Sequence, residues 1–345
     1  MKFNELRLEM TKAYSLAMDC FSNNDYENAY SNMMKASKLA KEISKICTLI
    51  EDIKEYENLS SHYYKKALDY HSFLDGDKKD VYAIEMPTNG FDDFIGLDKE
   101  KEYLKEEIIN PWKNNTFYQR NKNALLIYGP HGVGKTRFAH SIMKELHAKT
   151  YFIQPLKHFG MTDFPDVEFS FNNLFDQIEK ENNVVLFIES PVPYFSNGTD
   201  DFSKDICSLF TRLFKNELKK IKRKKLNVLL IATTSSPDKM NDKVFTNGLF
   251  DDFIRLHLPN ENIRLGLVNR YFGDKLTNDE KKYIVEKTSG FVNSDISRFC
   301  KEILESNSFD LGNITSHLST FKVENNDGYE SNVDSFESKI KDFLR

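Results

Sequence analysis

The chain has 345 residues, which is too long for one ordinary hydrophobic core and predicts two or three domains. Hydrophobic residues make up 40% and charged residues 29% of the sequence, a composition of folded globular proteins that excludes a largely disordered chain. The formal net charge of -5 gives no general reason to expect binding to nucleic acid.

The spacing of the cysteines and the hydropathy of the sequence indicate the cellular compartment in which the protein works. The cysteines lie far apart and form no C-x-x-C pair, so we expect reduced thiols and a cytoplasmic protein. No apolar run approaches the roughly 20 residues of a membrane span. The N-terminus alternates charged and apolar residues, and we expect no signal peptide there. The cysteines are Cys20, Cys47, Cys207 and Cys300.

Helical periodicity dominates residues 1–75. No proline precedes Pro87 and no glycine precedes Gly76, while apolar residues recur at helical spacing along three successive segments. We therefore expect three amphipathic helices that form a small bundle, near the lower size limit for independent folding. Residues 76–90 are polar and predict a linker.

From Phe91 the pattern changes to alternating strands and helices, which predicts a mainly parallel sheet covered by helices on both faces over residues 91–259. Residues 260–345 return to helical periodicity and predict a smaller helical part. The expected strands are Leu125–Tyr128, Tyr151–Gln154, Val184–Ile188, Val228–Ala232 and Phe253–Leu258. The expected late helices are Glu261–Phe272, Asn278–Thr288, Ser294–Ser306 and Val333–Leu344.

The most specific motif lies between the first strand and the helix that follows it. Its sequence fits G-x-x-x-x-G-K-[ST], a loop that binds the phosphates of a nucleoside triphosphate. In such a loop backbone N–H groups turn toward phosphate oxygens, Lys135 reaches the outer phosphates, and the Thr136 hydroxyl can ligate Mg²⁺. The candidate binding residues are Gly129, Pro130, His131, Gly132, Val133, Gly134, Lys135 and Thr136.

The residues around this loop resemble the AAA family of ATPases. The resemblance is to the branch that contains katanin, spastin, fidgetin and the vacuolar-protein-sorting ATPase that dismantles ESCRT filaments. Residues 91–98 (FDDFIGLD) are similar to the entry motif of that branch, and residues 289–296 (SGFVNSDI) to its lid motif T-x-G-[FY]-S-G-[AS]-D-[IL]. Residues 25–29 (DYENA) are similar to the microtubule-interacting and trafficking (MIT) domain, although a tetratricopeptide-like hairpin would show the same Tyr26-x-x-Ala29 spacing.

The resemblance implies an α/β P-loop AAA module with a parallel sheet, a helical lid, an N-terminal three-helix bundle, and ATP with Mg²⁺ bound between sheet and lid. It also implies self-association into a ring, in the family a hexamer, that pulls a partner's peptide through a central pore. Phe164, in a segment expected to be a loop, is the candidate pore aromatic, and residues 196–201 the second pore loop. The bundle would recognise a helical tail on a filament-forming or membrane-remodelling protein.

The resemblance places the catalytic carboxylates at the end of the strand that begins at Val184, where the family has Asp-Glu. In the favoured register Glu189 takes the metal-side place and Ser190 the place of the catalytic base; shifted by one residue, Glu189 would be the base and Ile188 would face the metal. Serine is a poor general base at neutral pH. Ser235 replaces the asparagine that senses the γ-phosphate.

The two arginines that the family directs at a neighbouring subunit's nucleotide are replaced by Thr246 and Leu249. Lys239 or Lys243 could supply a point charge instead, without the bidentate fork of arginine. The sequence therefore predicts a site with two halves: an intact binding half, which holds the nucleotide, and an eroded hydrolysis half, in which the residues that act in hydrolysis are replaced.

Three functions remain open. The first is an ATP-dependent remodeller or disassembler of a protein partner. The second is a weakened pseudo-ATPase that acts as a nucleotide-gated scaffold, or as a subunit of a mixed ring with an active AAA paralogue. The third, a nucleic-acid remodeller, rests only on the basic run Lys219–Lys225, which is more often the solvated end of a helix.

Overall fold

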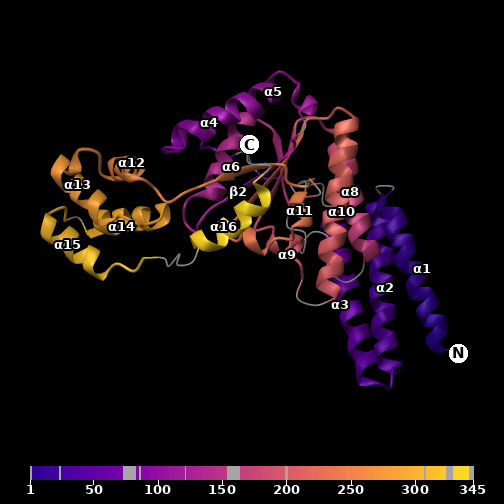
Figure 1. Cartoon of the computed structure of the whole chain (residues 1–345). Coiled ribbons are helices and arrows are strands. Elements are labelled where there is room, and N and C mark those ends of the chain that lie inside the picture. The colour runs from indigo at the N-terminus through magenta and orange to yellow at the C-terminus, as the bar shows by residue number, and fades with distance from the viewer. Residues whose placement is uncertain are drawn as a thin grey trace. The chain divides into compact units, whose positions relative to one another are not determined.

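The chain divides into two compact units, Met1–Val81 and Tyr82–Arg345 (Figure 1). We describe each unit by itself. The structure is a computed structural model, and it describes residues 2–22, 25–72, 83–84, 87–120, 122–153, 164–198, 201–246, 248–306, 308–323 and 329–341. The predicted linker lies largely outside these residues.

The first unit contains helices α1 (Lys2–Ser22), α2 (Tyr26–Ile46) and α3 (Ile50–Ser72), as the periodicity predicted. Helix α2 packs against both of the others, and fully buried alanines on α2 allow close approach. Buried serines on α2 and α3 satisfy each other, since each hydroxyl donates to the partner's backbone carbonyl at 2.8–2.9 Å. The alanines are Ala29, Ala36 and Ala40, and the serines are Ser37 and Ser60.

The second unit is built on a sheet whose described strands follow the order β1-β3-β4-β5-β2-β6. All neighbouring pairs are parallel except β1 with β3, so the predicted mainly parallel sheet is confirmed. The short strand β1 was not predicted. The strands are β1 (Ala83–Ile84), β2 (Ala124–Tyr128), β3 (Lys149–Phe152), β4 (Val184–Glu189), β5 (Val228–Thr234) and β6 (Asp252–Arg255).

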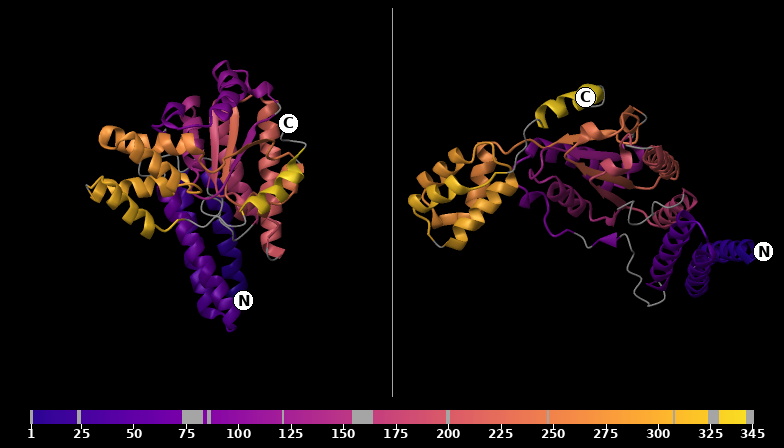
Figure 2. Two further views of the ribbon diagram at one scale, coloured as in Figure 1. Left: turned by 60° about the vertical axis from the view of Figure 1, so that its left-hand side comes forward. Right: turned by 90° about the horizontal axis from the view of Figure 1, so that it is seen from below.

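Helices cover both faces of the sheet (Figure 2). Strand β2 is buried throughout, with Leu126 and Tyr128 in the core of one face and Leu125 and Ile127 in the core of the other. The first face carries α8 (Phe164–Lys180), α9 (Val192–Phe195), α10 (Asp201–Arg223) and α11 (Lys243–Thr246). The second carries α4 (Asp98–Leu104), a π-helical turn (Lys105–Ile109), α5 (Asn110–Lys113) and α6 (Lys135–Leu146).

A separate hydrophobic core joins the helices that follow the sheet. The final helix, α16 (Tyr329–Ile340), instead packs on the first face of the sheet. There Phe336 contacts Tyr128 edge-on at 5.1 Å, and the Glu337 carboxylate accepts hydrogen bonds from Tyr128 at 2.9 Å and Arg255 at 3.0 Å. The lid helices are α12 (Glu261–Phe272), α13 (Asn278–Lys287), α14 (Asn293–Ser306) and α15 (Leu311–Thr320).

The sequence predicted a loop around Phe164, and this prediction is wrong for the residues of that segment that the structure describes. Phe164 is the first residue of α8, and its side chain lies outside the described residues. Pro165 at the second position is compatible with a helix, because the first turn needs no N–H from that residue. Apolar residues at helical spacing then bury the helix against the sheet: Val167, Phe171, Leu174, Phe175 and Ile178.

Candidate functional site

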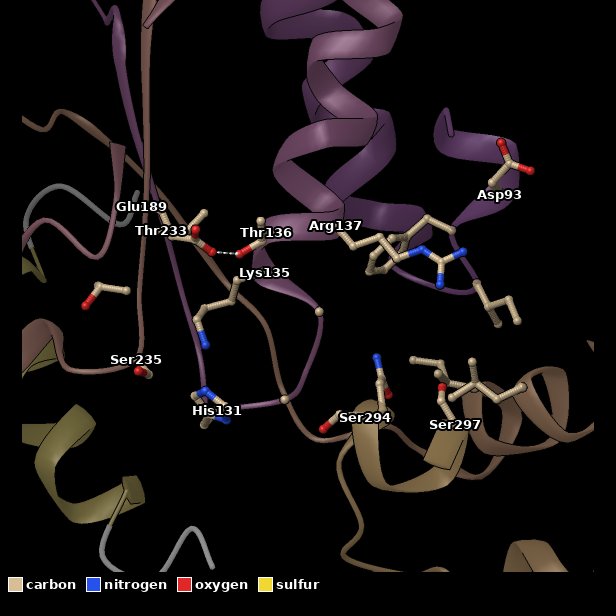
Figure 3. A pocket seen from close by; sticks show the side chains of 18 of the residues that line it. Asp93, His131, Lys135, Thr136, Arg137, Glu189, Thr233, Ser235, Ser294 and Ser297 are labelled. Carbon is tan, nitrogen blue, oxygen red and sulfur yellow. Dashed lines mark hydrogen bonds between the residues drawn. The ribbon is translucent and has the colours of Figure 1, made fainter. Parts of the chain in front are cut away.

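A cavity of about 410 Å³ lies where the loop after β2, the ends of β4 and β5, and the lid helices meet. Figure 3 shows the side chains that line it. Parallel strands place their carboxyl ends at one edge of a sheet, so the cavity occupies the position where open α/β sheets bind ligands. Most of the candidate site residues line the cavity: His131, Gly132, Gly134, Lys135, Thr136, Glu189, Ser190 and Ser235. The candidates Gly129, Pro130 and Val133 are not among its lining residues.

The loop between β2 and α6 depends on its glycines. Gly132 and Gly134 have φ values of 77° and 98°, which side chains adopt only with strain. A Cβ added at Gly129 would lie 2.4 Å from the Leu256 carbonyl oxygen. These residues allow the chain to turn sharply between strand and helix, and the N-terminus of α6 then faces the cavity.

Lys135 and Thr136 stand in the first turn of α6. The Lys135 ammonium donates to the carbonyl oxygens of Gly129 at 2.9 Å and Pro130 at 2.7 Å. Burial lowers the pKa of Lys135 to about 8, an effect that the nearby Glu189 carboxylate opposes. The Thr136 hydroxyl donates to Glu189 Oε1 at 2.6 Å (Figure 3). The Lys135 ammonium and the oxygen atoms of Thr136 and Glu189 thus lie together in the lining of the cavity.

The titration of Lys135 predicts a pH dependence of anion binding. Below about pH 8 the ammonium is charged and attracts phosphate, whereas above it the charge is lost. The second ionisation of a phosphate group, near about pH 6, is already complete there. We expect the affinity for ATP to be constant between pH 7 and 8 and to fall by up to about tenfold per pH unit above that. Calorimetric titration from pH 7 to 9.5 measures this, and a flat profile would contradict it.

The ends of β4 and β5 bring the remaining candidates to the cavity. Glu189 is the last residue of β4, and Ser190 follows with a φ of 56° and an N–H that donates to Thr233 at 2.9 Å. Ser235, just after β5, lines the same cavity as Thr233 and Ser190. The Thr136 hydroxyl thus joins the first turn of α6 to the last residue of β4.

The lid contacts the phosphate-binding loop directly. Asn293, which stands where the lid motif has glycine, donates its side-chain amide to the Val133 carbonyl at 2.8 Å. The Ser294 backbone N–H donates to the Gly132 carbonyl at 2.9 Å. These contacts hold the lid against the phosphate-binding loop at one side of the cavity. The sequence analysis assigned no role to four further residues of the lining, two of which lie in the entry and lid motifs: Asp93 and Asn293 in the motifs, and Arg137 and Arg270 outside them.

Thr246 and Leu249, which stand where the resemblance places two arginines, differ in their surroundings. Leu249 is buried in the core of the sheet at 1% exposure, so it presents no side chain to a neighbouring molecule. Thr246 ends α11, and its side chain lies outside the described residues. Lys239 and Lys243 are exposed and could contribute a charge at a surface.

A phosphate-binding loop at a strand–helix junction, a parallel sheet and a helical lid define a P-loop nucleotide-binding module. Residues 125–258 match the family described as "ATPase family associated with various cellular activities (AAA)". This part of the chain thus matches the AAA family, as the sequence motifs indicated.

Two relatives show how far the similarity extends. The chain is 26% identical over 228 residues to Vacuolar protein sorting-associated protein 4 of Dictyostelium discoideum, covering 63% of this chain and 50% of that protein. It is 26% identical over 227 residues to Protein SUPPRESSOR OF K(+) TRANSPORT GROWTH DEFECT 1 of Arabidopsis thaliana, covering 64% of this chain and 51% of that protein. The chain thus spans about half the length of these relatives.

The fold is also that of a solved AAA domain. The crystal structure of the FIGL-1 AAA domain superposes with a TM-score of 0.62 at 17% sequence identity, covering 80% of this chain and 95% of that one. At this identity the likeness concerns the fold.

Proposed function

We propose that the protein binds ATP with Mg²⁺ in the cavity between the sheet and the lid, and uses the bound nucleotide to remodel a protein partner. One observation carries the proposal: the phosphate-binding loop, the Lys135 ammonium and the Thr136–Glu189 pair line a single cavity that the lid borders. The similarity to AAA proteins over much of the chain supports it.

The donor set fits Mg²⁺, which prefers oxygen ligands and is commonly held by one or two protein groups together with nucleotide phosphates. The Thr136 hydroxyl and the Glu189 carboxylate provide such ligands. Among the described residues, no cluster of three or more His, Cys, Asp or Glu side chains could hold a metal alone. When bound, Mg²⁺ would offset negative charge on the outer phosphates.

The chain's own residues supply the rest of the chemistry. Lys135 would exchange its bonds to backbone carbonyls for bonds to the outer phosphates, while loop N–H groups hold the phosphate oxygens. The hydroxyls of Thr233 and Ser235, which also line the cavity, can donate to the terminal phosphate. Ser190, at the place of the base, cannot take a proton from water effectively at neutral pH. We therefore propose slow turnover.

For the partner we propose a helical tail on a filament-forming or membrane-remodelling protein, recognised by the α1–α3 bundle acting as an MIT-like domain. Ring assembly, as a hexamer or with an active AAA paralogue, would bring a second subunit to the cavity. A cytoplasmic location is consistent with the spaced cysteines, and no described helix could cross a bilayer. We also propose the domain boundaries that the sequence predicted: the helical bundle over residues 1–75, the linker over 76–90, the α/β part over 91–259 and the helical lid with the C-terminal helix over 260–345.

The second candidate is a nucleotide-gated scaffold without turnover of its own. Ser190 at the catalytic place and the burial of Leu249 favour it, because the hydrolysis half then lacks both a base and an arginine. In a mixed ring, a neighbouring paralogue would supply the arginines. The two candidates share the same nucleotide-binding step and differ in turnover.

The nucleotide-binding step is tested by titrating ATP and Mg²⁺ into the full chain and into Lys135→Ala. We expect Lys135→Ala to lose most of the affinity, since the ammonium is the cation that faces the outer phosphates. The matched control is Lys144→Ala, which removes one positive charge from the last turn of the same helix, outside the cavity lining. Equal affinity in wild type and Lys135→Ala would reject the proposal.

A further inference from the structure

Arg137 reaches the cavity on the side away from the catalytic residues. It follows Thr136 on α6, and consecutive helical residues project in different directions. In Figure 3 its guanidinium extends toward Asp93, opposite Glu189 and Ser235. Within the part of the chain that the structure describes, neither a hydrogen bond nor an ion pair involves this side chain. The guanidinium is thus an exposed and unpaired cation beside the cavity.

The position is electrostatically unfavourable in the absence of an anion. The first turn of α6 holds the cations Lys135 and Arg137 and no acidic residue. Positive charge at a helix N-terminus opposes the helix dipole. The Arg137 side chain therefore does not stabilise α6, and its placement is consistent with a role in ligand binding rather than in stability.

The lining near Arg137 is suited to a flat heterocycle. Four apolar side chains line the cavity, and the second arginine there already donates to the Asp93 backbone carbonyl at 2.6 Å. A planar guanidinium stacks readily on an aromatic face, where the ring quadrupole attracts the cation. The apolar residues are Phe94, Ile95, Ile263 and Leu267, and the second arginine is Arg270.

With the phosphates held at the loop, the base of a nucleotide would lie at this far end of the cavity. We propose that the Arg137 guanidinium stacks on the base of the bound nucleotide, which makes Arg137 a specificity-determining residue that favours nucleotides over bare polyphosphates. The inference rests on the proposed nucleotide site and adds to it the residue that recognises the base.

Two ligands separate contact with the base from contact with the phosphates. ATP and inorganic tripolyphosphate, each with Mg²⁺, are titrated calorimetrically into wild type, Arg137→Ala, Arg137→Lys and Lys144→Ala. We expect Arg137→Ala to bind ATP about tenfold more weakly and tripolyphosphate as wild type does. Arg137→Lys keeps the charge but not the planar group, so ATP binding should also weaken. Lys144→Ala should match wild type with both ligands.

Each contrary result has a distinct meaning. Equal weakening of both ligands in Arg137→Ala would show a phosphate contact and overturn the inference. Unchanged ATP affinity in Arg137→Ala, with wild type binding ATP, would overturn the inference alone. Failure of wild type to bind ATP would overturn the proposed function together with the inference. Thermal unfolding of Arg137→Ala, an exposed substitution expected to match wild type, checks that the variant is folded.

Discussion

Replacing Ser190 by glutamate is expected to raise ATP turnover by about 10²-fold or more, because a general base contributes roughly 10²–10⁴-fold to such rates. Ser190 follows β4 directly and lines the cavity beside Glu189, where a carboxylate could orient the attacking water. Its φ of 56° already carries the strain of a left-handed residue, so glutamate adds little new backbone cost. Steady-state phosphate release measures the change.

Two further variants make the Ser190 prediction specific. Ser190→Ala should leave turnover near wild type, since the hydroxyl is not expected to act as the base. The double variant Ser190→Glu with Lys135→Ala should return to background, because outer-phosphate binding is lost. A large drop in turnover for Ser190→Ala would show that the serine itself positions water, and would contradict our assignment of an eroded hydrolysis half.

Replacing Arg120 by methionine is expected to destabilise the second unit by about 3–5 kcal/mol, the typical cost of leaving a buried charge without its partner. The Arg120 guanidinium contacts the Asp252 carboxylate at 2.7 Å, with side-chain exposures of 10% and 4%. The Tyr103 hydroxyl also donates to Asp252 at 2.7 Å and accepts from Arg120 at 3.1 Å. Urea unfolding measures the loss of free energy.

An exposed arginine provides the matched control for Arg120. Arg212 contacts Glu168 at 2.6 Å, yet these side chains are 60% and 41% exposed, so Arg212→Met should cost at most about 1 kcal/mol. Adding Asp252→Asn to Arg120→Met should recover part of the loss, because it removes a buried charge that otherwise keeps the Lys122 ammonium at 3.7 Å but not the guanidinium at 2.7 Å. Equal costs for Arg120→Met and Arg212→Met would show that burial of the Arg120 pair has no energetic effect.

The sequence predicted the elements whose hydrophobic period is strong. Helix α12 has the expected bounds, while β2 begins one residue before its prediction and β5 ends two after it. The ends of helices and strands are less predictable, because neighbouring residues there have similar preferences for helix, strand or loop. At the start of α2 the Asp25 side chain accepts the hydrogen bond from the Asn28 N–H. Residues 23–25 (NND) are all good capping residues, and the sequence gives no basis for choosing among them.

The candidate phosphate-binding residues could be predicted from the sequence because local spacing alone defines the loop motif. The contact of Thr136 with Glu189 joins residues 53 apart, and only the packing of β2, β5 and β4 in one sheet brings them together. Arg137 was missed because the loop motif ends at Thr136. Asn293 lies within the lid motif but stands where the motif has glycine, so the motif gave no basis for predicting its hydrogen bond to the Val133 carbonyl.

Binding and turnover of ATP, measured on one purified sample with Lys135→Ala as the blank, test the central claim most directly. We predict Lys135-dependent binding with turnover only slightly above the blank, because the residues that bind phosphate line the cavity while Ser190 and Leu249 provide neither base nor arginine. Rapid turnover, well above about 1 s⁻¹, would contradict the eroded hydrolysis half. No Lys135-dependent binding would contradict the nucleotide site itself.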